Sequence, residues 1–242
     1  GKVIAFSSGN HGIGVAYAAR CLGMSASIVM PQDAPQVKIN QIEKLGADIV
    51  FFDRDTEDRE QIAFILGEQR KTPIVKPYDD WNTIIGQGTC GVEIQSQITD
   101  GLDSAIVCTG GGGLMAGIGS YLKYYFPKIA LYTAEPVGWD DHRVSLASGV
   151  RTAVTGEGST SCDGLLARIP GTLTFPINYS NGVSGLVAQD SMIARAMELV
   201  WYALGIKLEP SGAIGLACLM NTPERYKGQR VLVTLTGKNV DS

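Results

Sequence analysis

The sequence has few charged residues of either sign, and they form no blocks. Only 18% of its 242 residues are charged, against 45% apolar, and the formal net charge is −4. It has no cluster of Lys and Arg and no alternation of basic and aromatic residues, which argues against nucleic acid or an anionic membrane as a partner. Internal repeats and low-complexity tracts are also missing. The chain is long and apolar enough to bury the core of one large or two modest domains.

Cysteine pairs, targeting signals and membrane spans are missing as well. The five cysteines show no Cys-x-x-Cys spacing, which favours a reducing compartment over a disulfide or zinc framework. The uncharged stretch at 105–122 contains six glycines and begins like a strand, so it is not read as a membrane span. No charged segment followed by an apolar run opens the chain, so secretion is not indicated. We expect a cytoplasmic protein with no membrane partner.

What the sequence does contain is a regular alternation of strand and helix patterns. The first part predicts a small parallel α/β unit, with strands at 3–6, 26–30, 48–52 and 73–76 and helices at 13–22, 36–45 and 59–70. A second series predicts helices at 83–97, from 114, at 191–204 and at 213–220, with strands beginning at 105, at 129–133 and at 230–235. The fold class is therefore α/β with two parallel sheets.

Four consecutive glycines, Gly110 to Gly113, follow the strand pattern that begins at Ala105. Glycine tolerates positive φ angles and leaves the amides of a strand-to-helix turn open to an anion. Because ordering four glycines is entropically unfavourable, a phosphate site is a better interpretation than a flexible linker. The glycines alone do not identify the phosphate.

Other loops carry a resemblance to a known family. The sequence Ser7-Ser8-Gly9-Asn10-His11 resembles the substrate-carboxylate loop of fold-type II pyridoxal-phosphate (PLP) enzymes, in the form found in the serine/threonine dehydratase and serine racemase family. The resemblance continues, in the family's order and spacing, through Pro31-Gln32-Asp33-Ala34-Pro35, Gly86-Gln87-Gly88-Thr89, the four glycines, Ala134-Glu135-Pro136, Asp163-Gly164-Leu165, Glu209-Pro210-Ser211-Gly212-Ala213 and Thr236-Gly237-Lys238-Asn239-Val240-Asp241.

The resemblance implies the tryptophan-synthase-β-like PLP fold (fold type II), with a small domain inserted into a large one and the active site in the cleft between them. Here the small domain would be 2–79, and 80–242 would be the incomplete large, PLP-binding domain. The motif Ser-x-Lys-x-Arg-Gly-Ala, which carries the family's Schiff-base lysine, does not occur between Gly1 and Ser242. We therefore expect the N-terminal part of the large domain, including that lysine, on a segment that precedes Gly1.

By the same resemblance, the cofactor is held by residues from both parts of the chain: Asn10, Gly110, Gly111, Gly112, Gly113, Leu114, Gly164, Glu209 and Thr236. Thr236 would offer a neutral hydroxyl to the pyridine nitrogen, which makes the cofactor a weaker electron sink and favours elimination over transamination. Without the neighbouring motifs, Thr236 reads as the end of a buried strand. Lys238 stands where the family has glycine, and Tyr78 where dehydratases often have phenylalanine and racemases asparagine.

The substrate carboxylate would be held by Ser7, Ser8, Gly9, Asn10 and His11, with Ser8 also the candidate catalytic residue on the face opposite the lysine. A Ser or Asn there is otherwise an ordinary helix cap. Glu135 and Asp141, with the carbonyl of Trp139, have the spacing of the metal site seen in this branch, and their oxygen ligands suit Mg²⁺, Mn²⁺ or Ca²⁺. Two carboxylates at this spacing are also commonplace solvated groups.

The resulting hypothesis is a PLP-dependent ammonia-lyase that converts a hydroxy amino acid into a 2-oxo acid and ammonia. A serine-type racemase is the first alternative. The second is a non-catalytic or partner-completed module, because the lysine is missing from this chain. A homodimer acting on a small amino-acid substrate is implied by the resemblance alone.

Overall fold

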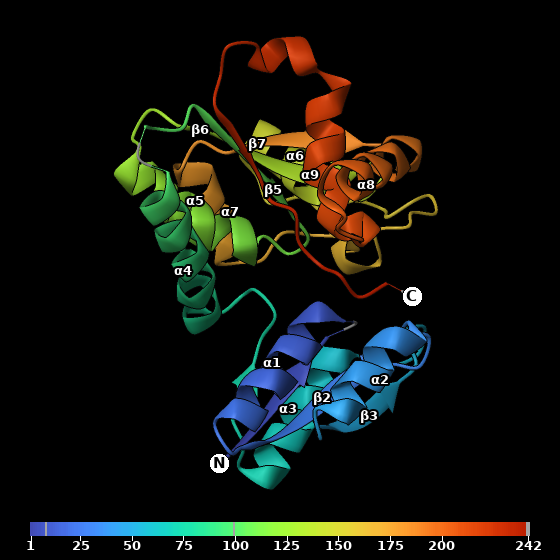
Figure 1. Ribbon diagram of the computed structural model, residues 1–242. Coiled ribbons are helices and arrows are strands. Elements are labelled where there is room, and N and C mark those ends of the chain that lie inside the picture. The colour runs from blue at the N-terminus through green and yellow to red at the C-terminus, as the bar shows by residue number, and fades with distance from the viewer. Residues whose placement is uncertain (8, 99, 241–242) are drawn as a thin grey trace. The chain divides into compact units, whose positions relative to one another are not determined.

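The computed structural model describes residues 1–7, 9–98 and 100–240, which fold into two compact units (Figure 1). The first unit is Gly1–Pro77 together with the C-terminal residues from Asn239, and the second is Tyr78–Lys238. The boundary lies two residues before the one predicted from the sequence, which also left the C-terminal residues with the second domain.

The first unit is a four-stranded parallel sheet in the order β3-β2-β1-β4. Its elements along the chain are β1 (Lys2–Phe6), α1 (Asn10–Cys21), β2 (Ser25–Pro31), α2 (Gln36–Lys44), β3 (Asp48–Phe52), α3 (Arg59–Arg70) and β4 (Ile74–Val75). Both faces of the sheet are covered, as parallel sheets require. Ala5 and Ile28 pack with residues of α1 and α2, and Ile4 and Val29 pack with Ala63 of α3.

The second unit has a parallel sheet in the order β7-β6-β5-β8. Its elements are α4 (Trp81–Gln97), β5 (Ser104–Cys108), α5 (Gly113–Tyr125), β6 (Ala130–Pro136), α6 (Asp141–Ser148), the 3₁₀ turn η1 (Asp163–Leu165), α7 (Thr174–Ser180), β7 (Ser184–Ala188), α8 (Asp190–Leu204), α9 (Pro210–Asn221), the 3₁₀ turn η2 (Pro223–Tyr226) and β8 (Val231–Val233).

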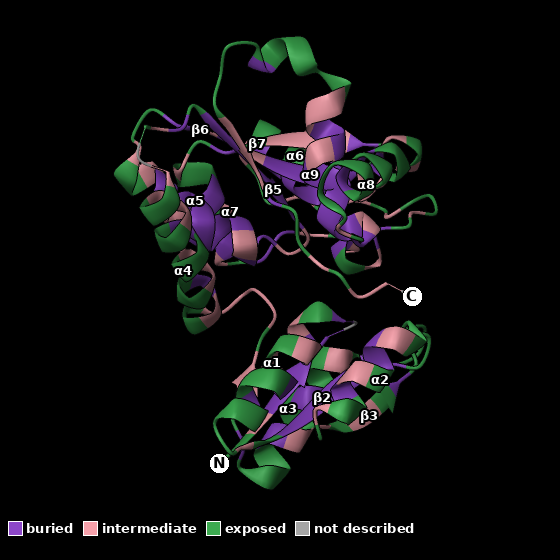
Figure 2. Cartoon of the chain, viewed as in Figure 1, coloured by how far each residue is buried: buried purple, intermediate pink, exposed green. Residues whose placement is uncertain are grey.

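Alternate residues of β5 point into two different cores, as expected for a strand. Ala105 and Val107 join a cluster that includes Met115 and Ile118 of α5. Ile106 belongs to a second cluster with residues of α8 and α9. Figure 2 shows the buried residues along β5 and α5. α5 therefore packs on one face of this sheet, and α8 and α9 pack on the other.

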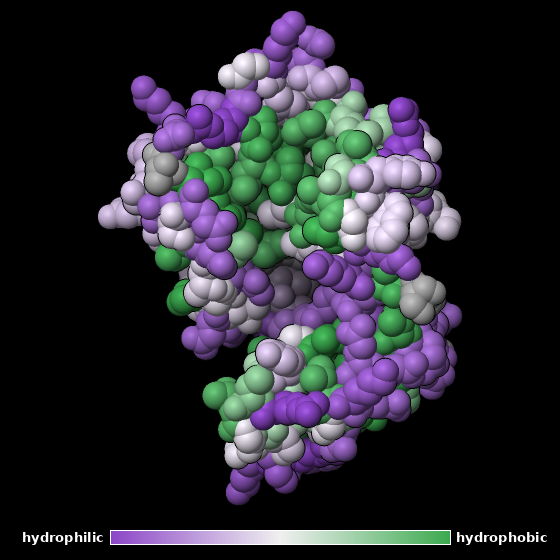
Figure 3. Space-filling model, in the orientation of Figure 1, coloured by the Kyte–Doolittle hydropathy of each residue, from purple (hydrophilic) through white to green (hydrophobic). Residues whose placement is uncertain are grey.

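The surface of the second unit has an apolar region over β5 and β8 on the face shown in Figure 3. β8 is the edge strand beside β5, and its three residues are only half-buried. Among the described residues, no helix is long and apolar enough to cross a membrane.

Candidate cofactor and metal sites

The strand order of the second unit places two loops side by side. The chain runs from β5 to β6 and β7 on one side of β5 and returns as β8 on its other side. In open parallel sheets, ligands bind at such a reversal, beyond the carboxyl ends of the strands. The two loops that leave β5 and β8 there contain the four glycines and Thr236. The topology therefore brings together two motifs that are more than a hundred residues apart.

The glycine loop has its carbonyls tied to the protein. The carbonyl of Gly111 accepts hydrogen bonds from Thr174 Oγ1 (2.6 Å) and the amide of Gly171 (3.3 Å). The carbonyl of Gly112 accepts from the amide of Ala116 (2.9 Å) and from Asn178 Nδ2 (3.4 Å). No hydrogen bond joins the amides of Gly110 to Gly113 to any other described residue. These amides at the start of α5 are thus available to an anion.

Close packing also explains why glycines are needed in this loop. A Cβ at Gly111 would lie 2.3 Å from the ring of Tyr78, and one at Gly113 would lie 2.8 Å from Tyr78 Cβ. Gly112 has a φ of +93°, and a Cβ there would lie 2.3 Å from Nε2 of His142. A side chain at Gly111, Gly112 or Gly113 would therefore clash with Tyr78 or His142.

The other predicted cofactor residues of the second unit lie next to this loop. A Cβ on Gly110 would lie 3.2 Å from the carbonyl of Gly164, whose amide donates to Ser211 Oγ (3.1 Å). Thr236 Oγ1 lies 3.3 Å from Cys108 Sγ, at the end of β5. Burial raises the pKa of Cys108, which stays a neutral thiol beside that hydroxyl.

Two further predicted residues flank the same edge of the sheet. Glu209 is buried and directly precedes α9, and its amide donates to the carbonyl of Gly237 (3.1 Å). Leu114 is the second residue of α5 and is half-buried against both cores. Their contacts with a cofactor remain predictions.

The predicted substrate loop follows β1 in the first unit, at the equivalent reversal between β1 and β4. The amide of Gly9 donates to Ser7 Oγ (3.0 Å), and Asn10 begins α1. Asn239 Nδ2 donates to Asn10 Oδ1 (2.5 Å), which ties the C-terminal residues to this loop. Ser8, the candidate catalytic residue, lies outside the described residues.

His11 is held inside the first unit. Its Nε2 lies 2.9 Å from the carbonyl of Val75 in β4. Burial lowers the pKa of His11, and the hydrogen bond to the carbonyl offsets only part of this effect. The ring therefore supports the loop as a neutral imidazole.

The candidate metal ligands Glu135 and Asp141 lie together in the structure, and His142 lies beside them. All three side chains are fully buried, and one ligand atom from each lies within 4.8 Å of the others. Glu135 is the last residue but one of β6, and its two oxygens accept from the amides of His142 (2.8 Å) and Arg143 (2.9 Å) at the start of α6. Neither carboxylate oxygen of Asp141 has a hydrogen-bond partner among the described residues.

This arrangement fits a divalent cation. Burial and the neighbouring Asp141 raise the pKa of Glu135 well above its ordinary value, against hydrogen bonds that lower it. Two buried carboxylates repel each other unless a proton or a cation neutralises them. The carboxylate oxygens of Asp141, which have no hydrogen-bond partner among the described residues, are the kind of ligand that divalent cations bind. The carbonyl of Trp139 stays a predicted ligand, while its side chain donates to the carbonyl of Gly158 (3.1 Å).

Two residues near these sites were missed in the sequence analysis. His142 follows a predicted ligand directly, which was the available signal. Lys38 is only 2% exposed, and its side chain would meet a Cβ placed on Gly9. It shares the buried face of α2 with Ile42, one helical turn later, so the helical periodicity already marked position 38 as an inward one.

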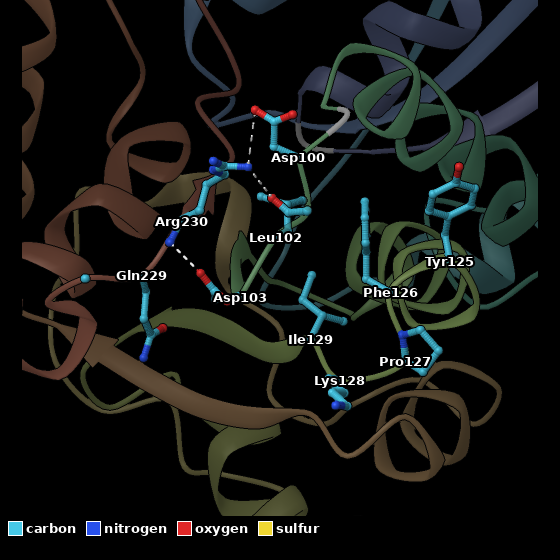
Figure 4. Close-up of a pocket in the computed structure, with 12 residues that line it drawn as sticks. Asp100, Leu102, Asp103, Tyr125, Phe126, Pro127, Lys128, Ile129, Gln229 and Arg230 are labelled. Carbon is cyan, nitrogen blue, oxygen red and sulfur yellow. Dashed lines mark hydrogen bonds and ion pairs between the residues drawn. The ribbon is translucent and has the colours of Figure 1, made fainter.

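A cavity of about 710 Å³ lies at the other end of the second sheet (Figure 4). It is lined by residues that precede β5 and β8, including Asp103 and Arg230, whose amide donates to Asp103 Oδ2 (2.7 Å). None of its lining residues is a predicted site residue. Because ligands of parallel sheets bind at the carboxyl ends of the strands, the glycine-loop end is the functional candidate.

Comparison with known proteins agrees with this geometry. Residues 1–237 match the family model described as pyridoxal-phosphate dependent enzyme. An L-threo-3-hydroxyaspartate ammonia-lyase from a Pseudomonas species is 39% identical over 239 residues, which are 99% of this chain and 74% of that protein. A serine racemase from Dictyostelium discoideum is 37% identical over 242 residues, again 99% of this chain and 74% of the relative.

Solved structures give the same result. The structure of maize serine racemase has a TM-score of 0.92 and 34% identity, and the match covers 99% of this chain and 73% of that one. The crystal structure of T.th. threonine deaminase has a TM-score of 0.91 and 32% identity, with 100% of this chain and 78% of the other covered. The matches span nearly the whole of this chain.

Proposed function

This chain belongs to the family of pyridoxal-phosphate-dependent enzymes, and we propose that it is an ammonia-lyase acting on a hydroxy amino acid. The β-hydroxyl would leave as water, and hydrolysis of the released enamine would take up one water to give a 2-oxo acid and ammonia. The observation that carries the proposal is the turn between β5 and α5. Its carbonyls are tied to Gly171 and α7, and its amides are left without acceptors among the described residues.

The residues of the second unit would hold the cofactor. The amides of Gly110 to Gly113 and the start of α5 would bind its phosphate. Thr236 would meet the pyridine nitrogen, and Gly164 would lie beside the ring. When bound, the cofactor withdraws electrons from Cα of the amino acid and makes its proton acidic. The neutral hydroxyl of Thr236, beside a neutral thiol, would not favour a protonated pyridine, which suits early loss of a β-hydroxyl.

The first unit would bind the substrate through its carboxylate. The positive end of the α1 dipole, at Asn10, is suited to an anion. A neutral His11 buttresses this loop against β4. By the family resemblance, Ser8 would exchange a proton at Cα on one face of the substrate.

A racemase is the second candidate function, supported by the 37% identity to a serine racemase. In a racemase, Ser8 would deliver a proton to the face of Cα opposite the one from which the family's Schiff-base lysine removes it. The two activities share the binding residues and differ in whether the β-hydroxyl leaves first.

We further propose that Glu135 and Asp141, with the carbonyl of Trp139, bind a divalent cation. We also propose that the protein is a cytoplasmic homodimer. Support for the ion comes from the unpartnered oxygens of Asp141. The dimer follows from the family resemblance alone and is checked by light scattering of the purified protein.

Product analysis tests the function. The protein as produced in its host, with PLP added, is incubated with L-threo-3-hydroxyaspartate, L-serine and L-threonine in turn. A lyase forms 2-oxo acid and ammonia in equal amounts. A racemase inverts Cα without releasing ammonia, which gives D-serine from L-serine and the Cα epimer from each of the other two substrates. If none of the three substrates gives either product, both enzymatic proposals are refuted and the binding-module alternative stands.

A further inference from the structure

His142 occupies an unusual position for a histidine. Its side chain is fully buried, and neither ring nitrogen has a hydrogen-bond partner among the described residues. Buried polar groups without a partner are rare, and each is destabilising by about 1–3 kcal/mol. A metal ion bound to one ring nitrogen would give this buried imidazole a partner.

The distances around His142 suit a shared ion better than direct hydrogen bonds. Nδ1 lies 3.5 Å from Asp141 Oδ2 and 4.0 Å from Glu135 Oε1. A charge-assisted hydrogen bond between these groups would be about 2.7–2.9 Å long. Two ligands of one ion, each about 2.0–2.2 Å from it, lie roughly 3–4.4 Å apart. Both measured distances fall within that range.

The nearby guanidinium of Arg143 does not neutralise the two carboxylates. The side chain of Arg143 pairs with Asp140, with Nε 2.6 Å from Oδ2, and it is 45% exposed. Only its backbone amide reaches Glu135. A positive charge between the buried carboxylates would therefore come from a bound ion.

We propose that Nδ1 of His142 is a ligand of the ion held by Glu135 and Asp141, so that the site prefers Mn²⁺, Fe²⁺, Co²⁺, Ni²⁺ or Zn²⁺ over Mg²⁺ and Ca²⁺. This inference rests on the proposed metal site. Imidazole nitrogen is a good ligand for the first group of ions, whereas Mg²⁺ and Ca²⁺ prefer oxygen alone. The side-chain ligands are then two carboxylates and one nitrogen, from the end of β6 and the start of α6, beside the proposed carbonyl of Trp139.

The opposite edge of the ring faces the glycine loop. Nε2 and Cε1 lie 2.3 and 2.7 Å from the place where a Cβ on Gly112 would be. Coordination through Nδ1 fixes the orientation of the ring under that loop, so the same side chain contacts both sites.

The first experiment needs no mutation. Mn²⁺ is bound to the intact protein, and electron spin-echo modulation is recorded with histidine at natural abundance and with ¹⁵N-histidine. The sequence holds two histidines, His11 and His142. A nitrogen modulation that changes on labelling supports coordination. Bound Mn²⁺ without nitrogen coupling overturns the inference and leaves the metal site standing, whereas no Mn²⁺ binding removes both.

The second experiment compares metal affinities by equilibrium dialysis of His142→Gln and of His11→Gln as the matched control. His142→Gln is expected to weaken Ni²⁺ and Zn²⁺ binding by at least about 10-fold and to change Mg²⁺ binding little. His11→Gln should retain the wild-type ratio of Ni²⁺ to Mg²⁺ affinity. An unchanged ratio in His142→Gln would overturn the inference, and should that variant not fold, the labelling experiment decides.

Discussion

Gly112→Ala should disrupt the glycine loop for two separable reasons. The residue has a φ of +93°, a backbone conformation that is unfavourable by about 1–2 kcal/mol for any residue with a Cβ. The new Cβ would also lie 2.3 Å from His142 Nε2 and 2.9 Å from Thr174 Oγ1. Such overpacking in a buried site destabilises by about 1–3 kcal/mol. The expected total is about 2–5 kcal/mol.

Gly158→Ala is the matched control for this change. Gly158 has nearly the same φ, +94°, and no atom lies within 4 Å of its added Cβ. The control should therefore show the backbone effect alone, about 1–2 kcal/mol.

Urea unfolding measures both free energies, and titration with PLP measures cofactor affinity. Only Gly112→Ala should weaken PLP binding, by about 10-fold or more, because a shift of 1.4 kcal/mol at the loop already has that effect. Equal destabilisation of the two variants, with equal PLP affinity, would refute the packing described around the loop.

Three further predictions concern the surroundings of the site. Gly212→Ala places a Cβ 1.3 Å from the carbonyl oxygen of Thr236, so α9 and that loop cannot both keep their places, and a loss of at least about 3 kcal/mol is expected in urea unfolding; wild-type stability would contradict this contact. Asp141→Asn should remove the rise in Tm that divalent ions give the wild type and, by ending the repulsion between buried carboxylates, leave Tm in chelator no lower than that of the wild type; a retained metal effect would place the ion elsewhere. Asp79 accepts hydrogen bonds from the amides of Thr172 (2.9 Å) and Leu173 (2.7 Å), so Asp79→Ala should be destabilising by about 0.5–2 kcal/mol at pH 7. Burial raises the pKa of Asp79, but these bonds and that from the Thr172 hydroxyl outweigh it and lower the pKa below its ordinary value of 3.8. The difference in unfolding free energy between wild type and variant should therefore be complete above pH 3.8 and disappear as the pH falls further. A difference that persisted in acid would contradict this role of Asp79.

Much of the fold was predictable because the strands of parallel sheets are continuous apolar runs. β3 and α3 have the bounds that the sequence predicted, and β2 extends one residue further at each end. α1 begins at Asn10, directly after its N-cap Gly9 and three residues before the predicted start at Ile13. The patterns of the long elements were strong enough to fix their order.

Three short elements of the second unit were not predicted. α7 has seven residues with Pro176 inside it, and the eight residues of α6 lack an apolar stripe. β7 contains Ser184 and Gly185, which are weak strand formers. Tertiary contacts form these elements. They also supply Thr174 and His142, which contact the glycine loop, so this part of the site could not be foreseen from local patterns.

The cluster of candidate metal ligands was likewise only partly predictable. The spacing of Glu135 and Asp141 was visible in the sequence, but spacing cannot show that both are fully buried. The burial of His142 beside them depends on how α6 packs near β6 and the glycine loop. A histidine next to a predicted ligand is informative only once that packing is known.

The phosphorus NMR spectrum of bound PLP would test the central claim, that the amides at the start of α5 hold the cofactor phosphate. The protein as produced in its host is titrated with PLP, and the chemical shift of the phosphate is followed between pH 5.5 and 8. Because hydrogen bonds to the charged form favour it, the bound phosphate should remain a dianion with a constant shift across this range. A bound phosphate that titrates as free PLP does, with a pKa of about 6 as for other phosphate monoesters, would contradict the account.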